Sequence, residues 1–392
     1  MKTVIHVTHE AVQKIGGIGA VLHGLLTSKA YNAAIQRDIL MGPLFTTDGP
    51  AEARLHGGEV LYSSIDGIVN HPYGARFAEI ERNYGVNLVY GRKIFHDQLT
   101  GVTATPEVLL IDVRHFDPGK AGIMKFVLYK DYGIESNKYE HVWDYEQYCR
   151  IALPGLEALH AIGVCCGTEP PIIISHEYMG MPTALAARSL HRGQFRTVFY
   201  AHEVATMRRI VEEHPGHDTM FYNVLKKAHE EHLNVDDVFG SQDDFYKHPL
   251  VKASRYCDNI FAVGDYVVKE LRFLNEDFET HPIDLAYNGV PAFQLTVAEK
   301  MTSRKRLQQY AENRSATPPT LSSPMSPASS PPKACGAICA SWSKWKKSAG
   351  ATTKPPSSTS SPPKPSAGAR RIFSTRKPPT SGLSPIARAI PI

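Results

Sequence analysis

Short apolar runs alternate with amphipathic stretches through most of the chain. The apolar runs predict strands at residues 3–7, 38–41, 87–90, 108–113, 171–175, 196–200, 259–263 and 283–287. Apolar positions at helical spacing between these runs predict helices at residues 20–30, 143–162, 182–190, 204–213 and 265–273. Because strand and helix alternate, we expect an α/β fold with a doubly wound, mostly parallel sheet. Ligands of such sheets bind at the carboxyl ends of the strands.

The pattern changes near residue 313. Residues 301–313 predict one more helix, and residues 314–392 consist mainly of Ser, Pro, Thr, Ala and Lys. A segment of this composition cannot bury enough apolar surface to offset its chain entropy. We therefore divide the chain into a globular domain at 1–292, a helical linker at 293–313 and a disordered, low-complexity basic tail at 314–392.

The charge of the tail is also unusual. It holds twelve Lys or Arg residues and no Asp or Glu, whereas residues 1–313 hold 31 basic and 39 acidic residues. Codons compatible with the sequence from Asn313 onward, shifted by one base, can encode a Gly/Pro-punctuated loop, an apolar strand, a basic loop and the start of a helix. We therefore favour an out-of-frame tail over a natural disordered one. The nucleotide sequence around codon 313 tests this frameshift hypothesis.

Composition narrows the class of protein. The acidic balance of residues 1–313 gives no reason to expect a nucleic-acid partner. The six cysteines include the adjacent pair Cys165 and Cys166, which is not typical of a disulfide framework. The N-terminus is typical of a strand rather than a signal peptide, and no apolar run approaches the length of a membrane span. We expect a cytoplasmic protein with no membrane partner, and the sequence leaves its oligomeric state open.

A glycine loop follows the first predicted strand. Lys14, Gly16 and Gly17 lie between that strand and the next predicted helix. Glycines let backbone N–H groups approach a phosphate, a helix N-terminus attracts the same anion, and lysine adds a full charge. The alternative is a turn that binds nothing. The loop does not match the dinucleotide pattern G-x-G-x-x-G, so we favour a phosphate site of another kind.

Two His-Glu pairs follow later strands. His176 and Glu177 come at the end of one predicted strand, and His202 and Glu203 come at the end of the next. One strand-helix unit separates the pairs, so both should face one crevice. An isolated histidine is more often structural, but the repeated placement favours a binding site.

Two further signals remain. Asn288 and Gly289 precede Val-Pro and mark a tight turn, which closes the last predicted strand and is a candidate joint to another domain. His6 and His9 lie near the end of the first strand. No carboxylate or thiol at metal-ligand spacing accompanies these two histidines, so we expect no metal site.

These motifs, in this order, resemble the N-terminal domain of glycogen and starch synthases and their relatives with the two-domain GT-B fold. Four segments carry the resemblance: residues 14–18 (Lys-x-Gly-Gly-Leu in the family), 176–178 (His-Asp-Trp or His-Glu-Trp), 199–203 (a strand ending in Thr-x-His) and 288–290 (an Asn-Gly-Val/Ile hinge). The resemblance covers about residues 2–312. It implies that residues 1–292 are a Rossmann-like N-terminal glycosyltransferase domain.

The resemblance also implies an activity. Such an enzyme is a retaining hexosyltransferase that moves glucose from ADP- or UDP-glucose to an α-1,4-glucan and needs no cofactor or metal. His176 would be the catalytic residue and would contact a hydroxyl of the transferred sugar. The substrate-binding residues would be Lys14, Gly16 and Gly17 near the donor diphosphate, and His202, Glu203, Asn288 and Gly289 near the cleft wall and hinge. Catalysis would rest on stabilising the charge of the departing diphosphate.

The sequence departs from the family at several places. Ala20 stands where bacterial synthases usually carry Asp, and Tyr178 replaces the usual Trp, so the donor nucleotide stays open. The family's Arg/Lys pair and Glu-rich loop belong to a C-terminal domain that the written sequence does not contain, although the shifted reading restores an Arg…Lys-Gly loop. We therefore expect this chain to transfer little or no sugar by itself.

Three other functions compete. One is another GT-B transferase that makes a small glycoside. The second is a non-catalytic module that binds glucan or nucleotide. A nicotinamide dehydrogenase is third, and the missing G-x-G-x-x-G disfavours it.

Overall fold

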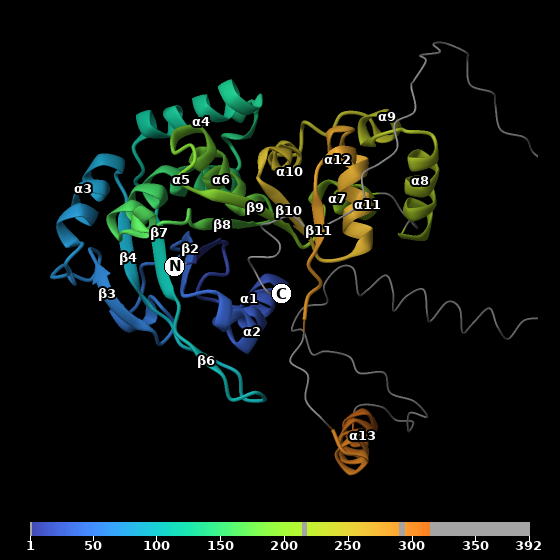
Figure 1. Cartoon of the computed structure of the whole chain (residues 1–392), viewed down its shortest axis with the longest axis horizontal. Helices are drawn as coiled ribbons and strands as arrows, with labels where there is room; N and C mark the ends of the chain where they lie inside the picture. The colour runs from blue at the N-terminus through green and yellow to red at the C-terminus, as the bar shows by residue number, and fades with distance from the viewer. Residues whose placement is uncertain (1, 214–217, 290–294, 314–392) are drawn as a thin grey trace, which may run out of the picture. The chain divides into compact units, whose positions relative to one another are not determined.

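A computed structural model describes residues 2–213, 218–289 and 295–313. Contacts divide the chain into two units, one of which holds the described residues up to 289 and the other residues 295–313. The tail at 314–392, which the sequence predicts to be disordered, lies outside the described residues. The first unit contains the main sheet and all the candidate site residues (Figure 1).

The first unit is built on one large sheet. Within the described residues its nine strands follow the order β11-β10-β9-β8-β1-β2-β7-β4-β3. They are β1 (Thr3–Val7), β2 (Arg37–Pro43), β3 (Glu59–Ser63), β4 (Asn87–Arg92), β7 (Glu107–Asp112), β8 (Ile172–His176), β9 (Arg196–Ala201), β10 (Asn259–Ala262) and β11 (Ile283–Leu285). Neighbouring strands are parallel except that β4 is antiparallel to both β3 and β7. The predicted α/β class with a doubly wound, mostly parallel sheet is confirmed.

Helices connect the strands and cover both faces of the sheet. Those before β8 are α1 (Gly17–Leu26), α2 (Lys29–Ala34), η1 (Ala51–Ala53), α3 (Gly74–Tyr84), α4 (Pro118–Tyr132), η2 (Ser136–Tyr139), α5 (Trp143–Ala161) and η3 (Val164–Cys166). Those after β8 are α6 (Glu177–Leu190), α7 (Ala205–Glu213), α8 (Asp218–Glu230), α9 (Val235–Phe239), α10 (Lys247–Lys252), η4 (Ala253–Tyr256), α11 (Asp265–Leu274) and α12 (Asp277–Thr280). Two short strands, β5 (Phe95–His96) and β6 (Thr103–Ala104), pair with each other. In Figure 1, α5 and α6 lie on one face of the main sheet and α1 and α2 lie on the other.

The central strands of the sheet are fully buried. Every residue of β1 and of β8 is buried, and the two strands pair in parallel with Val7 beside Ser175. Strands covered by helices on both faces bury both sets of side chains, which explains their continuous apolar runs. Polar side chains in these strands are therefore costly unless other groups satisfy them.

The winding of the chain reverses between β1 and β8. The chain first adds β2 on one side of β1, and after α5 it adds β8, β9, β10 and β11 on the other side. Right-handed crossovers then require helices on opposite faces, as Figure 1 shows for α1 and α6. A reversal of this kind leaves a crevice outside the carboxyl ends of the strands, where ligands bind.

Several predicted helices differ in extent from the observed ones. The stretch 20–30 forms two helices instead of one, because Ser28 caps the start of α2 by accepting the N–H of Tyr31 at 3.4 Å. The helix predicted at 182–190 begins at Glu177, with Pro182 inside it. Proline usually marks a helix start, but packing of α6 against α5 and β8 keeps the turn before Pro182 helical.

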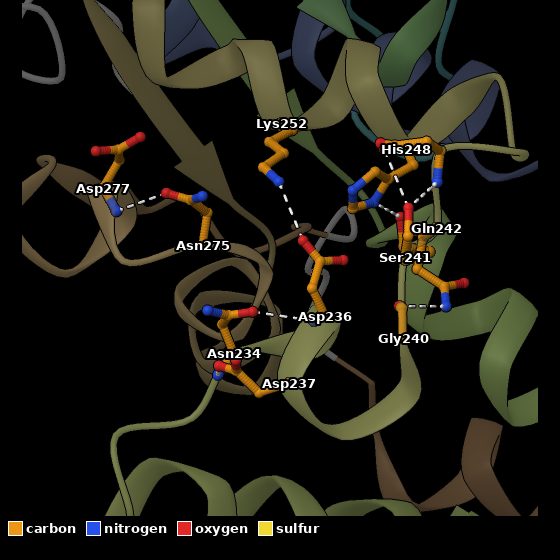
Figure 2. A network of polar contacts seen from close by, with 12 residues as sticks. Asn234, Asp236, Asp237, Gly240, Ser241, Gln242, His248, Lys252, Asn275 and Asp277 are labelled. Atoms are coloured by element: carbon orange, nitrogen blue, oxygen red, sulfur yellow. Dashed lines mark hydrogen bonds and ion pairs between the residues drawn. The ribbon is translucent and has the colours of Figure 1, made fainter. Parts of the chain in front are cut away.

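A polar network holds the start of α9 to the end of α10 (Figure 2). Asn234 Oδ1 accepts the N–H of Asp236 at 3.0 Å, and the Asp237 carboxylate accepts the N–H of Asn234 at 2.9 Å, forming a capping box. Lys252 Nζ lies 3.3 Å from the carboxylate of Asp236. These contacts fix α10, whose first residue, Lys247, belongs to the candidate site.

The second unit, as far as it is described, is a single helix. α13 (Val297–Glu312) starts with a capping box in which Glu299 accepts the N–H of Thr296 at 2.8 Å. The helix predicted at 301–313 is present and starts a turn earlier. No helix in the described part of the chain has both the length and the apolar character needed to cross a bilayer.

Candidate functional site

Residues from three neighbouring strands meet at the reversal of the sheet. His6 lies within β1, His176 is the last residue of β8, and His202 directly follows β9. The parallel register sets His6 beside Ile174 and His176 beside Tyr200. The sheet order thereby brings together histidines that are far apart in sequence.

The glycine loop is held by an internal carboxylate. Glu10 Oε2 accepts the N–H groups of Ile15 at 2.9 Å, Gly16 at 2.7 Å and Gly19 at 3.0 Å. A Cβ built on Gly19 would lie 2.6 Å from the same oxygen, so any larger residue there would displace the Glu10 carboxylate from the loop. Three amides of the loop therefore bind Glu10, and one of them is the Gly16 amide that the sequence predicted to bind a phosphate.

Other donors of the loop stay available. The N–H groups of Gly17 and Ile18, in the first turn of α1, have no acceptor among the described residues. Lys14 is exposed and lines a small cavity of about 260 Å³ together with Glu10 and Lys93. No hydrogen bond or ion pair within the described part of the chain joins Lys14 to His176. Anion binding at this loop would use the two free amides and Lys14 against the charge of Glu10.

A buried chain of hydrogen bonds runs through the histidines. His176 Nδ1 lies 3.0 Å from His202 Nε2, and His176 Nε2 lies 2.9 Å from His6 Nδ1. His6 Nε2 lies 3.0 Å from the hydroxyl of Tyr31 on α2, which donates to Asp38 Oδ1 on β2 at 2.6 Å. Both ring nitrogens of His176 are thus engaged, and its side chain is fully buried.

His202 is the outer member of this chain. It is half-buried, and its Nδ1 has no partner among the described residues and is not sealed from solvent. In this conformation His202 faces the crevice. A direct contact from His176 to a ligand would require one of its two ring hydrogen bonds to break.

Burial keeps these histidines neutral. It lowers the pKa of His6 to about 3 and the pKa of His202 to about 4. Burial, followed by the neighbouring His6 and His202, holds the pKa of His176 well below its usual range. Neutral imidazoles can donate or accept a hydrogen bond but bring no positive charge to the crevice.

Glu177 belongs to the first His-Glu pair, and the sequence assigned it no role of its own. It has a left-handed backbone, with φ 57°, and is buried. Its Oε1 accepts the N–H of Glu203 at 2.7 Å and also the N–H of His202. Burial, and secondarily the charge of Glu203, raise the pKa of Glu177 to about 8. Its Oε2 is buried with no partner among the described residues, so Glu177 carries an unused polar atom beside the crevice.

Glu203 has a different environment from Glu177. Its side chain is 38% exposed and forms an ion pair with Arg208 at 2.5 Å. Its backbone N–H, rather than its carboxylate, joins the buried network through Glu177. The carboxylate of Glu203 therefore points to the solvent side of the site.

Asn288 and Gly289 line a separate pocket of about 490 Å³. Gly24 of α1 and Tyr200 of β9 also line it. Tyr200 donates to the carbonyl of Ala286 at 3.0 Å and lies 3.5 Å from Asn288 Oδ1. Because Tyr200 also lies against His202, with ring centroids 4.4 Å apart, this pocket adjoins the outer end of the histidine chain.

A second cluster escaped the sequence analysis. Tyr178 and Tyr246 both donate to Asp144 Oδ2 at 2.5 Å. Lys247 Nζ lies 4.5 Å from the centre of the Tyr178 ring and has no ion pair among the described residues. Burial is the main cause of the lowered pKa of His9, and the positive charge of Lys247 adds to it. The same charge opposes the rise in the pKa of Glu177, so Lys247 lies near both residues. These residues come from α5, α6 and the start of α10, and no local motif links them.

The described residues contain no group of three His, Cys, Asp or Glu side chains arranged to hold a metal ion. The described residues offer hydrogen-bond donors and acceptors near the carboxyl ends of the central strands: the amides of Gly17 and Ile18 after β1, the outer nitrogen of His202 after β9, and the cation of Lys247 beside Tyr178. Such a set suits a polyhydroxylated or anionic ligand.

Comparisons with known proteins begin with two negative results. No model of a known protein family matches the chain. No curated protein matches it either.

Solved structures give weak likenesses. The chain is similar to the catalytic domain of starch synthase IV from Arabidopsis thaliana bound to ADP and acarbose, with 15% identity, 83% of this chain and 60% of that chain covered, and a TM-score of 0.39. It is also similar to an E. coli structure described as trehalose-6-phosphate bound with UDP-2-fluoro glucose, with 11% identity, 80% of this chain and 55% of that chain covered, and a TM-score of 0.31. A third similar structure is an α,α-trehalose-phosphate synthase (UDP-forming) from Burkholderia vietnamiensis, with 11% identity, 69% of this chain and 42% of that chain covered, and a TM-score of 0.26. The chain spans less than two thirds of each of these structures.

Proposed function

We propose that this chain contributes the N-terminal domain of a retaining glycosyltransferase that moves glucose from ADP- or UDP-glucose to an α-glucan. The observation that carries the proposal is that Lys14 and the free N–H groups of Gly17 and Ile18 follow β1, while His202 follows β9, two strands away in the same parallel sheet. Helix amides and a lysine suit a diphosphate, and a neutral histidine suits a sugar hydroxyl.

The roles of the two histidines differ within this proposal. His202 would contact a sugar hydroxyl through its outer Nδ1, because that atom has no partner in the described part of the chain. His176, which the resemblance assigns as catalytic, would hold His202 in place from within the core. Asn288 and Gly289 would shape the adjoining pocket of about 490 Å³.

One observation favours a second candidate function. Glu10 already binds three amides of the glycine loop, and its negative charge opposes the approach of a phosphate. A non-catalytic module that binds an uncharged glucan would not need that loop for anions. The two functions therefore differ in whether the chain binds the nucleotide-sugar or the glucan alone.

Binding to the full chain tests the proposal. Saturation-transfer NMR with ADP-glucose, UDP-glucose and a linear maltooligosaccharide should show binding of one nucleotide-sugar. We expect His202→Ala to weaken that binding about tenfold, because one or two hydrogen bonds to a buried ligand are lost. His141→Ala, which changes an exposed histidine two residues before α5, is the control.

Each outcome decides between the candidates. Binding of neither nucleotide-sugar contradicts the transferase, as does unchanged affinity in His202→Ala. Binding of the glucan alone supports the non-catalytic module. Radiolabelled transfer to glycogen by the same protein then measures activity.

The reading frame of residues 314–392 stays a separate hypothesis. We propose that this segment is translated out of frame, because it holds twelve basic residues and no acidic ones. An intact frame through codon 314 in the source DNA would contradict it.

A further inference from the structure

The donors and acceptors of the buried chain from His202 to Asp38 determine which atom carries each proton. A neutral imidazole has one N–H and one bare nitrogen, and a carboxylate only accepts. Tyr31 therefore donates to Asp38, and the Tyr31 oxygen accepts from His6 Nε2–H. The bare Nδ1 of His6 accepts from His176 Nε2–H, and the bare Nδ1 of His176 accepts from His202 Nε2–H. While Asp38 is ionised, all three histidines carry their proton on Nε2, and His202 presents a bare Nδ1 outward.

We propose that these five groups form a proton relay from the crevice to Asp38. A proton that reaches Nδ1 of His202 lets its Nε2 proton pass to Nδ1 of His176, whose own Nε2 proton passes to Nδ1 of His6. The Nε2 proton of His6 passes to the oxygen of Tyr31, and the tyrosine proton passes to Asp38. Each ring ends neutral with its proton on Nδ1. One proton has left the crevice, and the charge of Asp38 is neutralised.

The environment of Asp38 suits the terminus of a relay. Its side chain is 11% exposed, whereas that of His6 is fully buried, so a proton delivered to Asp38 can exchange with solvent. Among the described residues no lysine or arginine pairs with Asp38, and the neighbouring Arg37 is engaged by Glu107 at 2.7 Å. Burial raises the pKa of Asp38 to about 6, although its hydrogen bond from Tyr31 opposes the rise. The carboxylate can therefore gain and lose a proton near neutral pH.

The ionisable groups around the relay come from several elements. Asp38 faces His6 from β1 and Tyr31 from α2. Beyond these, the ionisable groups next to the relay are His9, Tyr200, Glu177, Glu203 and Lys247. Burying polar groups in one line through the core is costly unless each is satisfied. Among the described residues, the relay atoms without a partner lie at its two ends, the outer Nδ1 of His202 and Oδ2 of Asp38.

The inference rests on the proposed function only for the source of the proton. A sugar hydroxyl that attacks a glycosyl carbon must lose its proton as the new bond forms. The relay gives that proton a destination inside the protein in addition to the leaving diphosphate. The relay resets when His202 Nδ1 returns a proton to the departed diphosphate or to water and every other proton moves one step back, which leaves Asp38 ionised and the three rings as Nε2–H tautomers.

Nuclear magnetic resonance of the ring nitrogens tests the relay without any ligand. The full chain is labelled with ¹⁵N-histidine, and long-range ¹H–¹⁵N spectra distinguish the Nε2–H, Nδ1–H and imidazolium forms. At about pH 8 we expect His6, His176 and His202 to be Nε2–H tautomers, and at about pH 5 we expect all three to be neutral Nδ1–H tautomers. The three should change together, with one midpoint.

Two variants and a control complete the test. Tyr31→Phe interrupts the relay and should abolish the joint tautomer change. Asp38→Asn removes the titrating terminus and should do the same, which keeps the test open if Tyr31→Phe does not fold. Tyr62→Phe removes another fully buried tyrosine hydroxyl bonded to a carboxylate, that of Glu81 at 2.8 Å, and should leave the change intact.

Three results would overturn the relay: a histidine that changes at a different pH, an imidazolium at about pH 5, or an unaltered change in both Tyr31→Phe and Asp38→Asn. A joint tautomer change in a protein that binds no nucleotide-sugar would contradict the proposed function alone.

Discussion

At the scale of single residues, Glu177 links backbone conformation to the chemistry of the crevice. Its φ of 57° lies in the left-handed region, which costs a residue with a side chain about 1 kcal/mol or more. The conformation occurs where β8 turns into α6 and brings the carboxyl group to the N–H groups that follow β9. The strain is offset by hydrogen bonds that tie two neighbouring strand ends together.

The protonation of Glu177 predicts an effect on stability. Its pKa rises from about 4.5 unfolded to about 8 folded, so the folded state holds a proton that the unfolded state releases. Stability is therefore lost as pH rises from the unfolded to the folded pKa. We expect Glu177→Gln, whose amide is neutral at every pH, to stabilise the protein by on the order of 2 kcal/mol at about pH 8 and by much less at about pH 5.

Urea unfolding at both pH values measures this effect. Glu203→Gln changes a more exposed carboxylate and serves as the control. An equal gain at the two pH values, or a loss at the higher one, would show that Glu177 is ionised in the folded protein.

At the scale of elements, the contact between α6 and β8 depends on the absence of a side chain. A Cβ built on Gly180 would lie 2.5 Å from the Cα of Ser175 in the preceding strand. The first turns of α6 thus pack directly on the strand that ends in His176. Close packing at this point positions the histidine at the strand end.

Gly180→Ala should therefore push α6 away from β8. We expect a loss of unfolding free energy of about 2 kcal/mol, because backbone atoms have to move. Gly122→Ala is the matched control, since a Cβ on this glycine of α4 meets nothing within 4 Å and alanine favours helix. Chemical denaturation measures the unfolding free energy of both variants, and equal stabilities would contradict the packing argument.

At the scale of the whole molecule, buried acids and buried histidines have opposite effects on how stability changes with pH. Burial raises the pKa of Glu270 to about 7, adding to Glu177 and Asp38. Burial lowers the pKa of His248 to about 4, adding to His6, His176 and His202, the three histidines of the relay. The two sets act on stability in opposite directions along the pH scale.

We predict a stability maximum at about pH 6.5. Above it, the folded state keeps protons on the buried acids that the unfolded state has lost, so stability falls as pH rises towards the highest of their folded pKa values. Below it, the unfolded state protonates histidines that stay neutral in the fold, so stability falls as pH drops. Urea midpoints from about pH 5 to about pH 8 measure the curve, and a steady rise across that range would contradict it.

The sequence by itself determined eight of the nine strands described in the main sheet, the sheet class and the positions of the glycine loop and the two histidines, but it did not predict β3 or the short strands β5 and β6. These features depend on local periodicity and on the turn residues that follow each strand, which act over a few positions. The continuous apolar run before His176 could belong only to an element buried on both faces.

Only the tertiary structure decided which side chains meet. Glu10 fills the glycine loop, and His6 lies 170 positions from His176, its hydrogen-bond partner. Asp144 of α5 and Tyr246, which directly precedes α10, are hydrogen-bonded although they lie 102 positions apart in the sequence. Local patterns set the period and burial of each strand, but they do not specify the order of strands in the sheet. The contacts of the site depend on that order, because it determines which strand ends become neighbours.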